Sequence, residues 1–270
     1  MSHCLILQHD PAFGPGRLVN AFRDFGIPTR TVRLDQGEPV PDDFDEARLL
    51  VLLGGTQRLI DGESRPDWLD REVEAVRPLV MADRAVLGFG LGAQIIAKAA
   101  GGAVAPNASG ENEPSKPFYG WAPVKLPFPG GTDPILFGLH DGSSMFYWHK
   151  DSLELPKLPP PAGYDAKKPG PPPPTGSVLL ASSPHCRNAA FRFKERVYGF
   201  QFHAELDQDD FEQIASKHGG MAGAAFGSGE VGRISAETSK RIEEYRRLGT
   251  RLLKNYVQYF KAYNPAGVRT

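Results

Sequence analysis

Three glycines alternate with apolar residues at positions 88–92, between an apolar run and a segment with helical spacing. The stretch at residues 87–94 reads Leu-Gly-Phe-Gly-Leu-Gly-Ala-Gln. A strand-to-helix turn this tight exposes its central residue, Gly90, at the sheet edge, with the first N–H groups of the helix pointing toward it, as in a nucleophile elbow. The spacing also fits a phosphate-binding turn, but that turn follows the first strand of a βαβ unit. Here the glycines follow the fourth strand pattern, which favours the elbow, although glycine spacing alone does not decide it.

A histidine and a carboxylate lie two positions apart in residues 201–205, Gln-Phe-His-Ala-Glu. Histidine can act as a general base, and a carboxylate can fix its tautomer and orientation. Residues two apart on a strand share a face, but Glu205 lies where the strand pattern ends, so its direction stays open. Taken alone, His203 and Glu205 favour a surface histidine beside a helix start at residues 206–207.

We interpret a further pair, His149 and Asp151, as a strand-end histidine with a solvated aspartate rather than as a pair at the rim of a site. The seven histidines show no metal-binding spacing. Two cysteines, Cys4 and Cys186, are too few for a disulfide scaffold or a cysteine-rich zinc site. We therefore predict no metal, no cofactor and a reducing, cytoplasmic location.

The elements that must position these residues follow two patterns. The first 105 residues alternate between strand and helix patterns, which is typical of βαβ units on a parallel sheet. Strands are predicted at residues 4–8, 28–34, 48–53 and 85–89, and helices at 17–25, 68–81 and 92–100. The second half has short strand patterns, which predict an antiparallel extension of the sheet. They fall at residues 121–126, 145–148, 177–182, 190–193 and 197–202.

We expect residues 1–270 to form one domain. Residues 156–174 hold nine of the 25 prolines and predict an exposed polyproline-like loop. A tolerated surface insertion explains this loop better than a ligand for a proline-binding domain. Residues 219–232 are glycine-rich and predict a flexible segment, whereas residues 235–263 have apolar residues at helical spacing and predict a long amphipathic helix.

Composition excludes several classes of protein. The chain has 270 residues, 31 Lys plus Arg against 32 Asp plus Glu, and 40% hydrophobic residues. The near-neutral balance argues against a nucleic-acid or anionic-membrane surface, and the apolar content argues against a disordered chain. No apolar run approaches the roughly 18 residues of a membrane span, and the first residues do not predict a signal peptide.

Six segments in order resemble the class I glutamine amidotransferase domain family, in its stand-alone, GMP-synthase-like branch, from about residue 5 to residue 260. The resemblance implies a three-layer, flavodoxin-like α/β fold with a mostly parallel central sheet and an antiparallel extension. The matching segments are Gly54-Gly55 with the following Trp68-Leu69, the elbow at residues 88–94, Gly-Trp-Ala-Pro-Val at 120–124, Trp-His-Lys-Asp at 148–151, Leu-Leu-Ala-Ser-Ser at 179–183, and Gln-Phe-His-Ala-Glu at 201–205.

The family resemblance also implies a chemistry. A Cys-His-Glu triad hydrolyses the side-chain amide of glutamine and releases ammonia for transfer to an acceptor, often on a separate synthase protein. His203 and Glu205 match two triad members. Gly55 and Leu91 match the positions whose N–H groups stabilise the oxyanion, and Gly54 and Gln94 match the substrate pocket.

This sequence departs from the family at the nucleophile position, where the expected cysteine is Gly90. Two further positions differ from the family pattern. Ala204 stands where the family usually has proline, and Phe118 stands where many relatives have glutamate. We therefore expect glutaminase activity to be impaired or absent, through natural loss, through engineering or because the chemistry differs. Engineering usually replaces a catalytic cysteine with alanine or serine, so a glycine favours natural loss. Two alternatives are a pseudoenzyme that binds a metabolite or partner, and a hydrolase in which His203 and Glu205 activate water.

Overall fold

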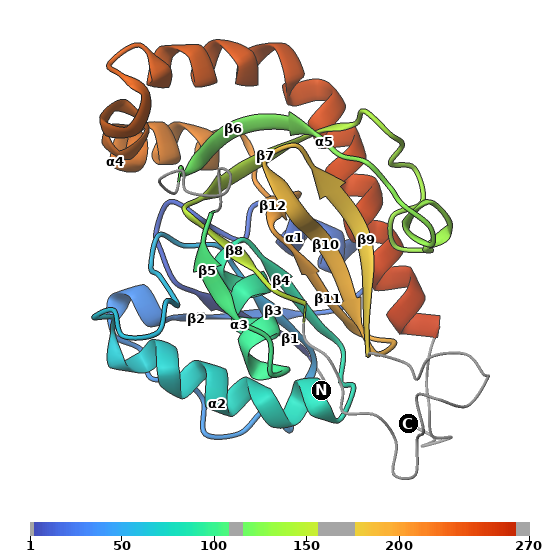
Figure 1. Cartoon of the computed structure of the whole chain (residues 1–270). Helices are drawn as coiled ribbons and strands as arrows, with labels where there is room; N and C mark the ends of the chain where they lie inside the picture. Colours follow the sequence, from blue (N-terminus) through green and yellow to red (C-terminus); the bar gives the residue numbers. More distant parts are fainter. Residues whose placement is uncertain (1–2, 108–115, 156–175, 263–270) are drawn as a thin grey trace, which may run out of the picture.

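The computed structural model describes residues 3–107, 116–155 and 176–262. Its largest sheet is built from β1 (His3–Gln8), β2 (Thr29–Arg33), β3 (Ala47–Leu52), β4 (Val86–Phe89), β9 (Ser177–Ser183), β10 (Cys186–Phe193) and β11 (Val197–Phe200). The strand order is β2-β1-β3-β4-β11-β10-β9 (Figure 1). Strands β2 to β11 in that order pair in parallel, and β10 and β9 continue the sheet antiparallel. The mostly parallel sheet with an antiparallel extension is therefore confirmed.

Helices cover both faces of this sheet, giving three layers. They are α1 (Leu18–Asp24), α2 (Asp67–Met81), α3 (Leu91–Ala99), α4 (Gln208–Phe226) and α5 (Glu230–Ala262). Alternate residues of a strand face opposite sides of a sheet. Leu5 and Leu7 of β1 accordingly join one core with residues of α2 and α3, whereas Cys4 and Ile6 join a second core with residues of α1 and α5.

Two predicted strands do not belong to the extension. Two smaller sheets are formed by β6 (Phe118–Pro123), β7 (Ser144–His149) and β12 (Phe202–His203), and by β5 (Val104–Pro106) with β8 (Asp151–Leu153). The strands expected at 121–126 and 145–148 thus pair with each other as β6 and β7 in a separate sheet. The strand expected at 197–202 divides at Gln201, whose N–H donates to the carbonyl of Ala189 at 2.8 Å. This break turns β12 toward β7. Short 3₁₀ turns, η1 (Leu34–Gln36) and η2 (Gly130–Thr132), complete the elements.

The glycine-rich segment at 219–232 is not the flexible segment that its composition predicts, so this prediction is wrong. Most of it lies inside α4 and α5. An Asp207–Asp210 capping box starts α4, which satisfies two of the N–H groups at its first turn. Gly219 lets the helices approach closely, because a Cβ atom there would lie 3.0 Å from a methyl group of Val231 in α5. Glycine here serves helix packing rather than mobility.

The closing helix, predicted at 235–263, is α5 and begins at Glu230. In Figure 1 its second half lies along the sheet, while its first half and α4 extend beyond one end of the sheet. The proline-rich residues 156–174 lie outside the described residues.

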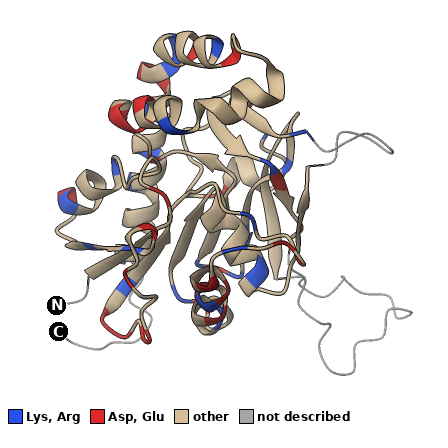
Figure 2. Ribbon diagram, turned by 90° about the vertical axis from the view of Figure 1, so that its left-hand side faces the viewer, with Lys and Arg blue, Asp and Glu red and all other residues tan. Residues whose placement is uncertain are grey.

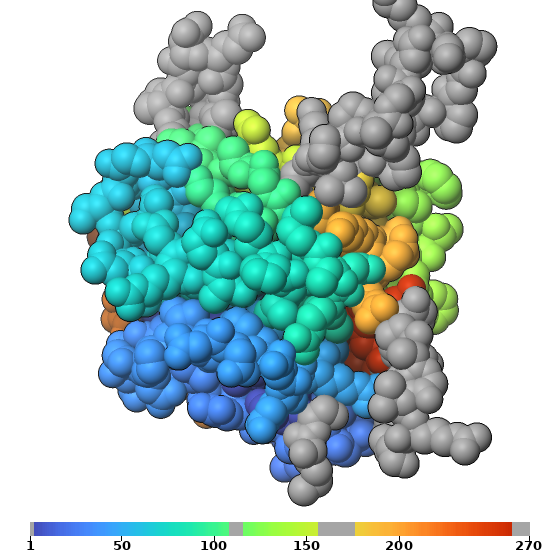
Figure 3. Space-filling view, turned by 90° about the horizontal axis from the view of Figure 1, so that it is seen from below, coloured from blue at the N-terminus to red at the C-terminus, as the bar shows by residue number. Residues whose placement is uncertain are grey.

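Both basic and acidic residues are present on the helices at the surface of the molecule (Figure 2). From below, the N-terminal segment and the segment containing α2 pack side by side (Figure 3).

In the described part of the chain, no helix is both long and apolar enough to cross a membrane.

Candidate active site

The turn predicted as an elbow joins β4 to α3 through Gly90. Gly90 has φ 52° and ψ −112°, a conformation that side-chain-bearing residues rarely adopt. A Cβ atom at Gly88 would lie 2.5 Å from the carbonyl group of Gly92, and one at Gly92 would lie 2.1 Å from the carbonyl oxygen of Leu52. Both flanking glycines are therefore required by the close approach of backbone segments across the turn.

His203 and Glu205 form a buried pair beside this turn. The Nδ1 atom of His203 lies 2.7 Å from an oxygen of Glu205, and the two side chains are 1% and 0% exposed. The N–H of Ala204 donates to the other carboxylate oxygen at 2.8 Å. The ring of Phe13 packs on the imidazole with centroids 5.0 Å apart. The interpretation of His203 as a surface residue is therefore wrong, because β12 carries it into the core.

The second ring nitrogen of His203 faces Gly90. This Nε2 atom is buried, and it has no hydrogen-bond partner in the described part of the chain. A Cβ atom at position 90 would lie 3.1 Å from Nε2 and 3.0 Å from Cε1. Gly54 bounds the same space, since a Cβ atom at position 54 would lie 2.5 Å from Cε1 of His203. The imidazole thus lies directly over two glycines, with an unpaired nitrogen next to Gly90.

Gly55, Leu91 and Gln94 line a small cavity beside the elbow. Among the residues that the structure describes, the N–H groups of Gly55 and Leu91 have no hydrogen-bond acceptor. The amide nitrogen of Gln94 donates to the carbonyl of Asp151 at 3.2 Å and lies 3.3 Å from Gln201 Oε1. The cavity volume is about 20 Å³, enough for about one water molecule.

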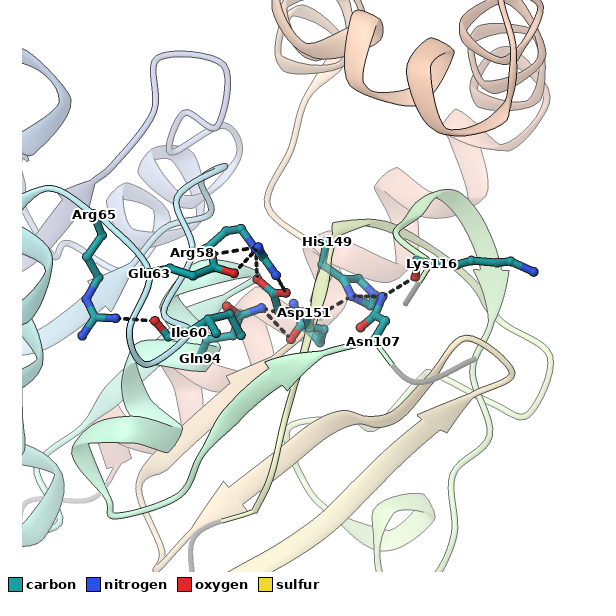
Figure 4. A network of polar contacts seen from close by, with 10 residues as sticks. Arg58, Ile60, Glu63, Arg65, Gln94, Asn107, Lys116, His149 and Asp151 are labelled. Atoms are coloured by element: carbon teal, nitrogen blue, oxygen red, sulfur yellow. Dashed lines mark hydrogen bonds and ion pairs between the residues drawn. The ribbon is translucent and has the colours of Figure 1, made fainter. Parts of the chain in front are cut away.

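An ion-paired cluster closes one wall of this cavity (Figure 4). Arg58 donates to both oxygens of Asp151, at 2.9 and 2.5 Å, and also contacts Glu63 at 2.7 Å. The Asp151 side chain is 3% exposed. The expectation of a solvated aspartate is therefore wrong, because Arg58, 93 residues away in sequence, replaces the solvent.

His149 is also buried at this wall. Its Nδ1 atom lies 3.1 Å from the carbonyl oxygen of Asp151 and 3.3 Å from the amide nitrogen of Asn107 (Figure 4). Burial is the main cause that lowers the pKa of His149 to about 4, the carbonyl of Asp151 opposes it, and the nearby imidazoles of His203 and His185 contribute to the lowering, so the ring is neutral near pH 7. Tyr119 lines the same cavity. Burial, together with the charge of Asp151, raises the pKa of Tyr119 to about 12. His149 and Asp151 thus belong to the wall of the candidate site.

Sequence reasoning missed Arg58 and the buried His9. His9 follows β1 directly, and Arg58 lies three residues after the Gly54-Gly55 pair. Their position after the carboxyl ends of parallel strands, where ligands gather in open α/β sheets, was the available signal.

The assembled groups can hold and move a proton. An imidazole oriented by a carboxylate can act as a base, and free N–H groups can stabilise a carbonyl oxygen. No side chain at position 90 can attack a carbonyl carbon. In the described part of the chain, no group of three or more His, Cys, Asp or Glu residues is arranged to hold a metal ion.

Comparison with known proteins identifies the family of the chain. The family model "Glutamine amidotransferase class-I" matches residues 16–217 of the 270. The glutamine amidotransferase-like protein YfeJ of Salmonella typhimurium is 26% identical over 208 residues, covering 76% of this chain and 77% of YfeJ. The fold resembles the glutamine amidotransferase of Methylobacillus flagellatus, with a TM-score of 0.75, 21% identity, and 96% and 95% of the two chains covered.

A more distant structural match is a GMP synthase subunit of Thermoplasma acidophilum, with a TM-score of 0.56, 20% identity, and 97% and 96% of the two chains covered. These structural matches show the fold, and the family model covers well over half of the sequence. The chain therefore belongs to the class I glutamine amidotransferase family.

Proposed function

We propose that this chain is a class I glutamine amidotransferase-like pseudoenzyme, with the general base and oxyanion donors of a glutaminase but without its nucleophile. The proposed roles are general base for His203, orienting carboxylate for Glu205, and oxyanion donors for the N–H groups of Gly55 and Leu91. Gly54 and Gln94 would bound the substrate pocket. Glutamine, or a related amide, is the proposed ligand.

One observation carries this proposal: the unpaired Nε2 atom of His203 lies over Gly90, about where a thiol would need its base. In triads of this kind, loss of the nucleophile lowers the rate by several orders of magnitude, and the remaining groups recover only a small part of it.

Ammonia release from glutamine tests the proposal on the unmodified chain. We expect the unmodified chain and its His203→Ala variant to give the same rate as buffer. Clear release by the unmodified chain that His203→Ala abolishes would contradict the pseudoenzyme proposal.

That contrary outcome would favour a second candidate, a hydrolase that uses water. The cavity lined by Gly55 and Leu91 has room for about one water molecule, and the buried His203–Glu205 pair could accept a proton. Ammonia release that depends on His203 and persists when Cys4 and Cys186 are both replaced would identify this mechanism.

A separate partner completes the proposed function. One distant structural match is a GMP synthase protein, and by analogy we propose a synthase or acceptor protein as the partner of this chain. Both cysteines are free and buried, which supports a reducing, cytoplasmic location.

A further inference from the structure

A second buried histidine–glutamate pair lies on the other side of the Gly54–Gly55 turn. The Nε2 atom of His9 lies 2.9 Å from an oxygen of Glu72 in α2, and both side chains are 0% exposed. The Nδ1 atom of His9 lies 2.9 Å from the carbonyl oxygen of Leu53. Trp68 stacks on the imidazole with centroids 5.7 Å apart and an angle of 11° between the planes. The ring is thus held at both nitrogens and on one face.

These contacts favour the protonated form of His9. A carbonyl oxygen only accepts hydrogen bonds, so Nδ1 carries a proton. A carboxylate at Nε2 favours a proton there too, so both contacts favour the protonated form of the ring. Burial of the ring opposes this charge, but the charge and hydrogen bond of Glu72 and the carbonyl of Leu53 outweigh burial and raise the pKa of His9.

His9 holds the turn at three points. Its imidazole binds the Leu53 carbonyl, and its own carbonyl accepts a hydrogen bond from the side chain of Gln57 at 2.8 Å. A Cβ atom at Gly55 would lie 3.1 Å from the Cβ of His9. On the opposite side, a Cβ atom at Gly54 would collide with His203. The two glycines therefore pass between two buried histidines, each oriented by a glutamate.

We propose that His9, held by Glu72, is a positioning residue that fixes the Gly54–Gly55 turn so that the N–H of Gly55 can donate to the carbonyl oxygen of a bound amide. The proposal rests on the oxyanion role proposed for Gly55. His9 itself touches no reacting atom, and its influence passes through the backbone of residues 53–57.

The test uses the full chain carrying Gly90→Cys, with His9→Gln or Glu72→Gln added. Two rates are measured: kcat for ammonia release from glutamine, and alkylation of the introduced thiol by iodoacetamide. Removing one oxyanion donor lowers kcat by about 10²–10³-fold, so we expect kcat to fall about 100-fold. Alkylation needs the thiol and its base but no carbonyl donor, so its rate should change less than about twofold.

Leu79→Ala is the matched control, because Leu79 lies in the same helix, α2, and in the core away from the turn. It should lower stability while leaving both rates nearly unchanged in the folded protein. An unchanged kcat in His9→Gln, or equal falls in both rates, would overturn the positioning role.

If Gly90→Cys releases no ammonia, the proposed function fails and the positioning role is tested without it. This test uses ¹H–¹⁵N spectra of the chain that keeps Gly90. In this background His9→Gln should shift the Gly54 and Gly55 amide signals and speed their hydrogen exchange at least tenfold, whereas Leu79→Ala should do neither. Unchanged Gly54 and Gly55 signals in His9→Gln would overturn the role.

Discussion

The imidazole of His203 lies over Gly90 so closely that a Cβ atom at position 90 would be 3.1 Å from its Nε2 atom. His203 cannot easily withdraw, because Glu205 holds Nδ1 at 2.7 Å and Phe13 packs on the ring. The imidazole therefore limits the space for a side chain at position 90, which makes this position sensitive to substitution.

Gly90→Ala should destabilise the fold more than a substitution at a glycine with positive φ in open space. Backbone strain at such positions costs about 1–3 kcal/mol, and contact with His203 adds to it. Gly142, with φ 89° and no atom within 4 Å of its Cβ position, provides the matched control. Urea unfolding should show Gly90→Ala to be less stable than Gly142→Ala by about 1 kcal/mol or more. Equal losses would mean that His203 does not press on the elbow.

Gly92→Ala should be among the most damaging small substitutions in the chain. Its Cβ atom would lie 2.1 Å from the carbonyl oxygen of Leu52, and Leu52 is held in the sheet by pairing with both β1 and β4. We expect a loss of more than about 3 kcal/mol. Gly220→Ala in α4, where nothing lies within 4 Å, should instead stabilise by about 0.5–1 kcal/mol, because alanine favours the helix. Similar effects of the two changes would contradict the close packing of the elbow.

The alternating glycines favoured the elbow but did not by themselves exclude a phosphate-binding turn. The steric causes at Gly88 and Gly92 involve the backbone of Gly92 and of Leu52, which only the folded structure brings close. The His203–Glu205 contact could not be read from spacing, since it depends on β12 leaving the main sheet after Gln201. Arg58 and Asp151 are 93 residues apart, and only the packed fold joins them. The glycines of α4 were misread because glycine allows close helix packing as readily as it allows flexibility.

Removing Arg58 should test the buried ion pair at the cavity wall. The Arg58 side chain is 31% exposed but Asp151 is only 3% exposed, so Arg58→Leu leaves a buried carboxylate without its partner. Breaking a fully buried pair costs about 3–5 kcal/mol, and partial exposure of Arg58 reduces our expectation to about 1–3 kcal/mol. Adding Asp151→Asn should recover part of the loss in thermal unfolding. A double variant less stable than Arg58→Leu would contradict this pairing.

Acid should destabilise the protein through His149. The folded pKa is lowered to about 4, whereas an unfolded histidine titrates near 6.5. Between these values the unfolded chain binds the additional proton, so stability falls as pH drops from about 6.5 toward 4. The full shift corresponds to about 3 kcal/mol.

Unfolding free energies at pH 7 and pH 4.5 should therefore differ less in His149→Phe than in the unmodified chain, with the exposed His140→Asn as control. Asp210, whose pKa is raised to about 7 by burial and by the charges of Asp207 and Glu205, contributes the opposite slope in every variant and cancels in the comparison. An identical pH dependence in His149→Phe and the unmodified chain would refute the neutral, buried state.

Restoring the nucleophile tests the central claim most directly. Ammonia release from glutamine is measured for the unmodified chain, for Gly90→Cys, and for Gly90→Cys combined with His203→Ala. We predict no release by the unmodified chain, measurable release by Gly90→Cys, and its loss when His203 is also replaced. Release by the unmodified chain that equals that of Gly90→Cys would contradict the claim that this site lacks only its nucleophile, and so would a folded Gly90→Cys variant with no activity.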